Sequence, residues 1–276
     1  MELGEERILR EVSTWELELS DYVSNDFEKV YEIWVKDQFA KLPDNTQHRF
    51  FEVMDQWILY TYTFLQSTNA QVDATNRILQ VGRTYDESIE RVEDLRSISI
   101  EKLTYMADQQ VARNRLYAFS QGGITGTGGW LLLGLDFPMM IALNLRSVQL
   151  IGTCFGYNMH NPLEMILALK VFHAGAMPKR MQYLAWEELK GSMEELEGIM
   201  DEQEWITDES WLEPPLQNLF KTLAIVMFKK KMLQGIPIVS VGIGAVSNYK
   251  LAKQVSDFAK KFYQYRLIHE KNGWSK

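Results

Sequence analysis

One acid, Asp136, and one base, Arg146, stand in the most apolar part of this chain. A single buried charge is costly, so each of the two needs a partner. If a helix begins at Pro138, Asp136 can cap it, while Arg146 lies about 12 Å along its axis, too far for a direct pair. We therefore expect Asp136 to be a cap and Glu164 to be the partner of Arg146. The functional alternative is that Arg146 binds a lipid phosphate or a substrate carboxylate.

Six glycines precede this pair, between Gly122 and Gly134. Glycine costs about 1 kcal/mol relative to alanine inside a helix, so this density indicates special backbone angles or a close approach to the main chain. The loop Gly122–Gly129 could hold an anion with its backbone N–H groups, but Trp130 stands where a P-loop has lysine. Tight helix–helix contact or an apolar hairpin is the structural alternative. The glycines that a ligand or lipid would contact are Gly122, Gly123, Gly126, Gly128 and Gly129.

The remaining reactive side chains predict neither catalysis nor metal binding. The four histidines have no i, i+3 or i, i+4 pair, so no metal site is expected. Cys154 stands six residues from the nearest histidine, His160, and is expected to be a small buried core residue. No Gly-x-Ser-x-Gly nucleophile elbow is present. We assign no catalytic residue and no cofactor.

The charge balance excludes one class of partner and favours another. The chain has 276 residues and a formal net charge of -8, so nucleic acid is not the expected partner. The acidic first residues do not form a signal peptide. The cluster Lys229, Lys230 and Lys231 adjoins an apolar run and would attract anionic lipid by roughly 1 kcal/mol per lysine.

Two uncharged stretches, Leu116–Leu135 and Met232–Tyr249, are broken by glycine, proline or polar residues. A spanning helix needs roughly 20 mainly apolar residues, which neither stretch supplies cleanly. We expect a protein that is soluble or peripheral to a membrane, and keep true insertion as the alternative. The predicted membrane contacts are Ile124–Leu135 and Ile236–Val246.

Apolar residues recur at helical spacing through most of the chain, which predicts an all-α fold: a multi-helix bundle with two Gly-rich apolar hairpins. Asn161 is expected to cap a helix that has Pro162 at its first position. One domain is expected over residues 5–270, with an N-terminal helical layer (5–110) and a Gly-rich apolar core (114–270). The other expected helices cover 48–65, 87–110, 138–155, 181–200, 216–231 and 248–271, while 236–246 could pass for one short strand.

In the order of its motifs the chain resembles the EcsC family of bacterial proteins. The matching segments are Gly122–Gly129, Asp136–Pro138, Asn144–Arg146, Phe155–Tyr157, Ile236–Asn248 and Ala259–Tyr263. The family is named after a protein encoded beside an ABC transporter. The resemblance therefore implies a non-enzymatic accessory protein, peripheral at the cytoplasmic face of the membrane and linked to such a transporter. It transfers no catalytic residues. The alternatives are a soluble hydrolase or ligand-binding protein with a pocket at Gly122–Gly129, and a soluble helical scaffold.

Overall fold

A computed structural model describes residues 2–23, 69–125, 129–200 and 240–273. Every regular element in these ranges is a helix, which confirms the all-α prediction. The elements are α1 (Leu3–Ser20), α4 (Asn69–Arg83), the short 3-10 helix η1 (Glu93–Ser97), α5 (Ile100–Thr125), α6 (Gly129–Cys154), α7 (Pro162–Ala176), α8 (Lys179–Met200) and α10 (Ser240–Asn272).

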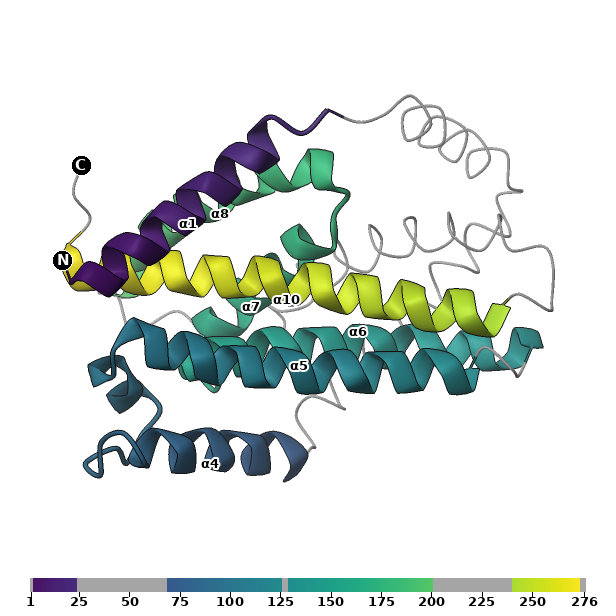
Figure 1. Cartoon of the computed structure of the whole chain (residues 1–276), viewed down its shortest axis with the longest axis horizontal. Coiled ribbons are helices and arrows are strands. Elements are labelled where there is room, and N and C mark those ends of the chain that lie inside the picture. Colours follow the sequence, from purple (N-terminus) through teal and green to yellow (C-terminus); the bar gives the residue numbers. More distant parts are fainter. Residues whose placement is uncertain (1, 24–68, 126–128, 201–239, 274–276) are drawn as a thin grey trace.

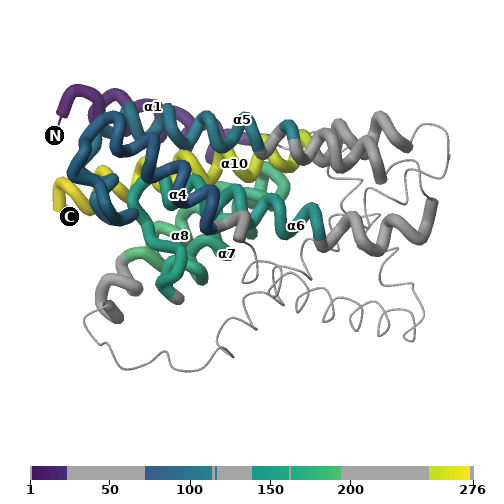
Figure 2. The backbone as a smooth tube through the Cα atoms, turned by 90° about the horizontal axis from the view of Figure 1, so that it is seen from below, coloured from purple at the N-terminus to yellow at the C-terminus, as the bar shows by residue number. Residues whose placement is uncertain are grey.

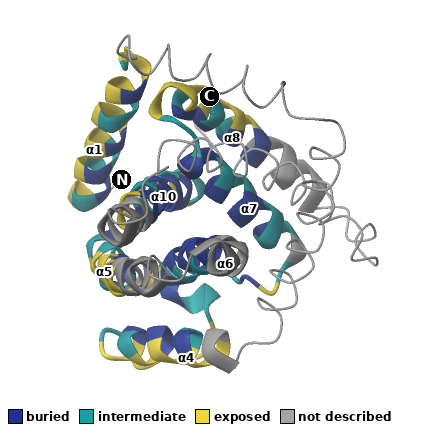
Figure 3. Cartoon of the chain, turned by 90° about the vertical axis from the view of Figure 1, so that its right-hand side faces the viewer, coloured by how far each residue is buried: buried dark blue, intermediate teal, exposed yellow. Residues whose placement is uncertain are grey.

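The centre of the fold consists of three long helices that lie side by side. Helices α5 and α6 form an antiparallel hairpin, and α10 lies along both of them (Figure 1). Helix α7 packs on α6 and α10, and α8 lies beside α7 (Figure 2). Helix α1 packs on α8 and α10. Viewed end-on, α10 lies among α1, α5, α6 and α7, while α4 packs against α6 on the far side from α10 (Figure 3).

Local sequence signals explain where several helices begin and end. The side chain of Asn161 accepts a hydrogen bond from the N–H of Leu163, at 3.0 Å, and Pro162 is the first residue of α7, so the predicted cap is confirmed. Helix α6 ends at Cys154, two residues before Gly156, whose φ of 85° suits glycine. The N–H of Tyr157 then donates to the carbonyl of Gly152, which closes the helix end.

An aromatic cluster joins α1, α8 and α10. The ring of Trp186 is fully buried and meets Trp15 edge-on, with centroids 5.0 Å apart, and Phe258 at 5.8 Å. Such edge-to-face pairs add roughly 0.5–1.5 kcal/mol each beyond their apolar area. The cluster fixes α1 to the central helices although α1 is sixty or more residues away from each of them in sequence.

Three predicted helix starts are wrong. The helix expected over 87–110 begins instead at Ile100, after the 3-10 helix η1. Helix α6 begins at Gly129, so Pro138 lies inside it and Asp136 does not cap it. An internal proline removes one backbone hydrogen bond and costs about 3 kcal/mol, which contact with α5 and α10 must outweigh. Helix α10 begins at Ser240 rather than near Asn248, so Ser240–Val246 is helical and not a strand.

Helix α4 had no counterpart among the expected helices. Its sequence has few large apolar residues, and Ala74, Ile78 and Leu79 are the buried ones. Predictions over residues 24–68 and 201–239 lie outside the described residues. Among the residues that the structure describes, no helix is long and apolar enough to cross a membrane.

Candidate functional site

The two glycine-rich uncharged segments meet at one end of the three-helix core. Helix α5 ends there at Thr125, α6 begins there at Gly129, and α10 begins there at Ser240 (Figure 1). No charged residue occurs from Leu116 to Thr125, from Gly129 to Leu135, or from Ser240 to Tyr249. We call these three helix segments the uncharged end.

The glycines of the predicted anion-binding loop are largely helical. Gly122 and Gly123 belong to α5 and Gly129 is the first residue of α6, while Gly126 and Gly128 lie outside the described residues. The N–H groups near the end of a helix are already bonded within it, and its free carbonyls carry the negative end of the dipole. That end of α5 is therefore a poor anion cradle, and the helical-hairpin interpretation fits these residues better.

The other predicted contacts are dispersed. Asp136 and Arg146 both lie on α6, ten positions apart, and Arg146 is only half-buried. Glu164, the expected partner of Arg146, instead places both carboxylate oxygens on Arg266, at 2.6 and 2.8 Å. The lysine cluster Lys229–Lys231 lies outside the described residues.

The opposite end of the core contains a buried ion network. Besides its two bonds to Glu164, Arg266 donates from Nε to Glu270 at 2.6 Å. Glu270 also accepts from the hydroxyl of Tyr157 at 3.1 Å and pairs with Arg96 at 3.3 Å. The network therefore joins η1, α7, α10 and the loop after α6, and we call this region the charged end.

The aromatic ring of Tyr157 lies against the two arginines of that network. The guanidinium groups of Arg266 and Arg96 lie 4.0 and 4.5 Å from its ring centroid. Burial raises the pKa of Tyr157 well above its usual value, so the hydroxyl stays a donor. Burial alone would lower the pKa of Arg266, but the hydrogen bonds to Glu164 more than offset it and raise that pKa. These groups stabilise each other.

Cys154, His160 and His173 lie where the sequence predicts, and His48 lies outside the described residues. Cys154 is fully buried, and burial raises the pKa of its thiol, so it is held unreactive. His160 and His173 lie at opposite ends of α7. Within the described ranges, no three His, Cys, Asp or Glu side chains gather as a metal site would require.

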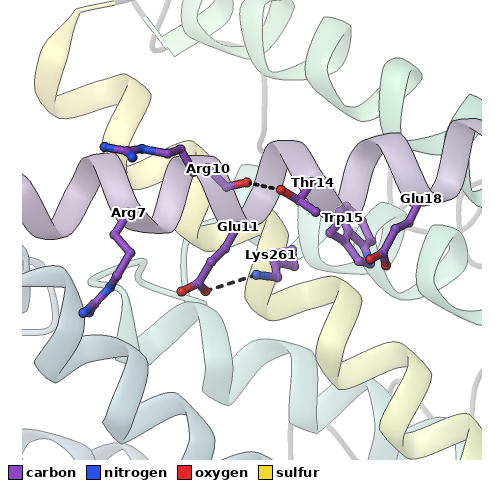
Figure 4. A pocket seen from close by; sticks show the side chains of 7 residues that line it. All are labelled: Arg7, Arg10, Glu11, Thr14, Trp15, Glu18 and Lys261. Carbon is purple, nitrogen blue, oxygen red and sulfur yellow. Dashed lines mark hydrogen bonds and ion pairs between the residues drawn. The ribbon is translucent and has the colours of Figure 1, made fainter.

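Two adjoining cavities lie along α1, the first between α1 and α10 and the second between α1, α8 and α10. The first, of about 590 Å³, runs along α1, where the amine of Lys261 reaches between the helices to Glu11 at 3.6 Å beside Trp15 (Figure 4). The second, of about 530 Å³, continues toward the start of α10 and shares Trp15, Glu18 and Lys261 with the first.

Sequence reasoning did not find the second cavity, although a signal for it exists. The lysines of α10 that line it stand at positions 250, 253, 260 and 261. Steps of three, seven and one residues keep them on one side of a helix. Lysines at this spacing are also typical of any solvent-exposed helix face. Only the packing of α1 and α8 against α10 turns this face into one wall of a cavity.

Known proteins resemble this chain over nearly its whole length. The model of the EcsC protein family matches residues 6–268. In Bacillus subtilis (strain 168), Protein EcsC is 22% identical over 180 residues, covering 65% of this chain and 70% of that protein. The uncharacterized protein YdbA of the same organism is 22% identical over 283 residues, covering 95% of this chain and 92% of its own. No solved structure matches the chain. Since the family model spans nearly the whole length, this chain belongs to the EcsC protein family.

Proposed function

We propose that this EcsC-family protein is a non-enzymatic accessory protein that attaches peripherally to an anionic membrane surface through its uncharged end. The observation that carries the proposal is the meeting of two uncharged helical segments, more than a hundred residues apart in sequence, at one end of the core (Figure 1). An uncharged group of helix ends can enter the lipid interface at little electrostatic cost.

The length of the uncharged end fits shallow insertion. On α6, the seven residues Gly129–Leu135 precede the first charge, Asp136, which is about 10 Å of helix. On α10, ten residues precede Lys250, which is about 15 Å. Interfacial helices bury roughly 5–10 Å into the boundary between headgroups and acyl chains, whereas a full hydrocarbon core is about 30 Å thick.

Basic residues border the uncharged end. Arg113 on α5 and Lys250 and Lys253 on α10 are exposed. They would lie at headgroup depth if the helix ends entered the interface, where each is worth about 1 kcal/mol against anionic lipid. The lysines Lys229–Lys231 would add to this attraction if they lie nearby.

The cytoplasmic face of the membrane and an ABC transporter are the place and partner that the family resemblance implies, and both remain part of the proposal. The alternative of a soluble hydrolase or ligand-binding protein requires a pocket at Gly122–Gly129. The helical state of Gly122 and Gly123 favours the membrane interpretation over that alternative.

Flotation of the purified chain with vesicles tests the proposal. We expect flotation with phosphatidylglycerol vesicles that high salt weakens but does not abolish. Leu132→Asp/Leu133→Asp, at the uncharged end, should abolish it. Leu184→Asp, at a leucine that is 69% exposed on α8, is the matched control and should float like the wild type.

Three results would contradict the proposal: no flotation of the wild type at low salt, equal flotation of the Leu132/Leu133 variant, or equal loss in the Leu184 control. Circular dichroism of each variant should show the same helical content, so that a loss of flotation is not a loss of fold.

A further inference from the structure

The cavity of about 530 Å³ between α1, α8 and α10 has the size of a small-molecule site. Its lining combines an aromatic floor with a basic rim. Trp15 and Phe258 supply the floor, and five lysines face two acids, Glu18 and Asp257, around it. The five lysines are Lys179, Lys250, Lys253, Lys260 and Lys261. On a chain with a net charge of -8, the lining of this cavity therefore has a local excess of positive charge.

Not all of this positive charge is neutralised. Lys260 pairs with Asp108 at 2.7 Å and Lys261 with Glu11 at 3.6 Å. Lys250 and Lys253 are exposed and make no ion pair with any residue that the structure describes. Burial lowers the pKa of Lys261, which shows that the cation there lacks full compensation. An anion in the cavity would supply it.

The walls of the cavity are held in place before any ligand arrives. The amide nitrogens of Gln182 and Gln254 each donate to the carbonyls of Gly175 and Met177, over 2.7 to 3.2 Å. These four bonds join the start of α8 and the middle of α10 to the end of α7. A rigid wall reduces the entropy lost on binding.

The beginning of α8 adds to the positive field. Lys179 is the first residue of this 22-residue helix, and it lines the cavity with Gln182 of the same first turn. The positive end of the α8 dipole therefore lies at the same cavity as the five lysines.

We propose that this cavity binds a small organic phosphate, with the phosphate against Lys179, Lys250 and Lys253 and an apolar group of the ligand on Trp15. Two sources can supply that chemistry: the headgroup of a phospholipid, or a soluble phosphorylated compound. Lys250 adjoins the uncharged end, so a headgroup could enter from a membrane surface. The cavity does not require that surface for binding.

Isothermal titration calorimetry on the full chain separates these sources. The probes are dihexanoyl phosphatidate below its micelle concentration, glycerol 3-phosphate, inorganic phosphate and dihexanoyl phosphatidylcholine. We expect the phosphatidate to bind, and Lys250→Gln/Lys253→Gln to weaken it by about tenfold or more. The control Lys102→Gln/Lys271→Gln, at two exposed lysines outside the cavity, should bind like the wild type.

Phosphatidate binding tighter than glycerol 3-phosphate would support the lipid source, and equal binding would support a soluble phosphate compound. The proposal is overturned if phosphatidate, glycerol 3-phosphate and inorganic phosphate all fail to bind, if the Lys250/Lys253 variant binds as tightly as the wild type, or if the control variant loses as much affinity. These probes are monomeric and contain no membrane surface. The titration therefore tests the cavity even if the flotation experiment shows no binding to vesicles.

Discussion

The two ends of the central three-helix core differ in their charged residues: one end buries and pairs them, and the other has none. The charged end buries Glu164 and Arg266, 5% and 8% exposed, and satisfies them with each other and with Glu270. The uncharged end has no charge to satisfy over ten residues of α10. One end has a fixed set of partners inside the protein, and the other is left able to accept partners outside it.

Removing one member of the buried network should have the largest effect on folding. Arg266→Ala leaves the Glu164 carboxylate buried without its partner, so we expect a loss of about 3–5 kcal/mol in the free energy of unfolding, measured with urea. Lys250→Ala, on the same helix but exposed, should change it by no more than about 0.5 kcal/mol. Similar losses of unfolding free energy in both variants would contradict the proposed difference between the two ends. Arg266→Met/Glu164→Leu should recover much of the loss, because no charge is then buried alone.

A glycine substitution at the charged end should also destabilise the fold. A Cβ on Gly152 would overlap the methyl of Met159 and stand 2.7 Å from the ring of Tyr263. The methyl can move, but the fully buried ring cannot, so Gly152→Ala should cost about 1–3 kcal/mol in urea unfolding. An unchanged midpoint would show that this end is packed more loosely than the geometry indicates.

The same substitution at the uncharged end should have the opposite sign. Gly122 lies in α5, and among the described residues only Gly156 and Gly273 have positive φ. Alanine fits a helical backbone better, so Gly122→Ala should stabilise the protein by about 0.5–1 kcal/mol. The same urea series measures it beside Gly152→Ala. Destabilisation would instead identify Gly122 as a point of close helix approach.

The smallest effect concerns pH. Burial lowers the pKa of His173, partly opposed by Glu188, and burial followed by repulsion from Lys190 lowers that of His269. The unfolded chain then binds protons more readily, so stability should fall as the pH drops below about 6.5. His173→Gln should flatten the dependence of the urea midpoint between pH 5 and 7, whereas His160→Gln, at an exposed position, should not. A steeper dependence in His173→Gln would contradict the assignment.

Local signals in the sequence predicted local structure well. The pair Asn161-Pro162 located the start of α7 to the residue, and Gly156 marked the end of α6, because caps depend only on neighbouring backbone. The same reasoning failed at Pro138, where contacts between α5, α6 and α10 sustain a helix through a residue that usually begins one.

Partners distant in the chain were beyond sequence reasoning. Glu164 was assigned to Arg146, yet its partner Arg266 lies 102 positions away. The cavity likewise depends on three helices that no local pattern brings together. The glycine segments were recognised as unusual from their composition, but only the fold shows that they share one end of the molecule.

The position of Cys154 has one practical consequence. It is the single thiol of the chain and is fully buried beside the helix end that Gly156 closes. A thiol reagent can therefore modify the protein only while this region is open, so the rate of labelling reports the population of opened molecules. The native cysteine thus reports opening of the purified chain, in solution or on vesicles, without an introduced cysteine.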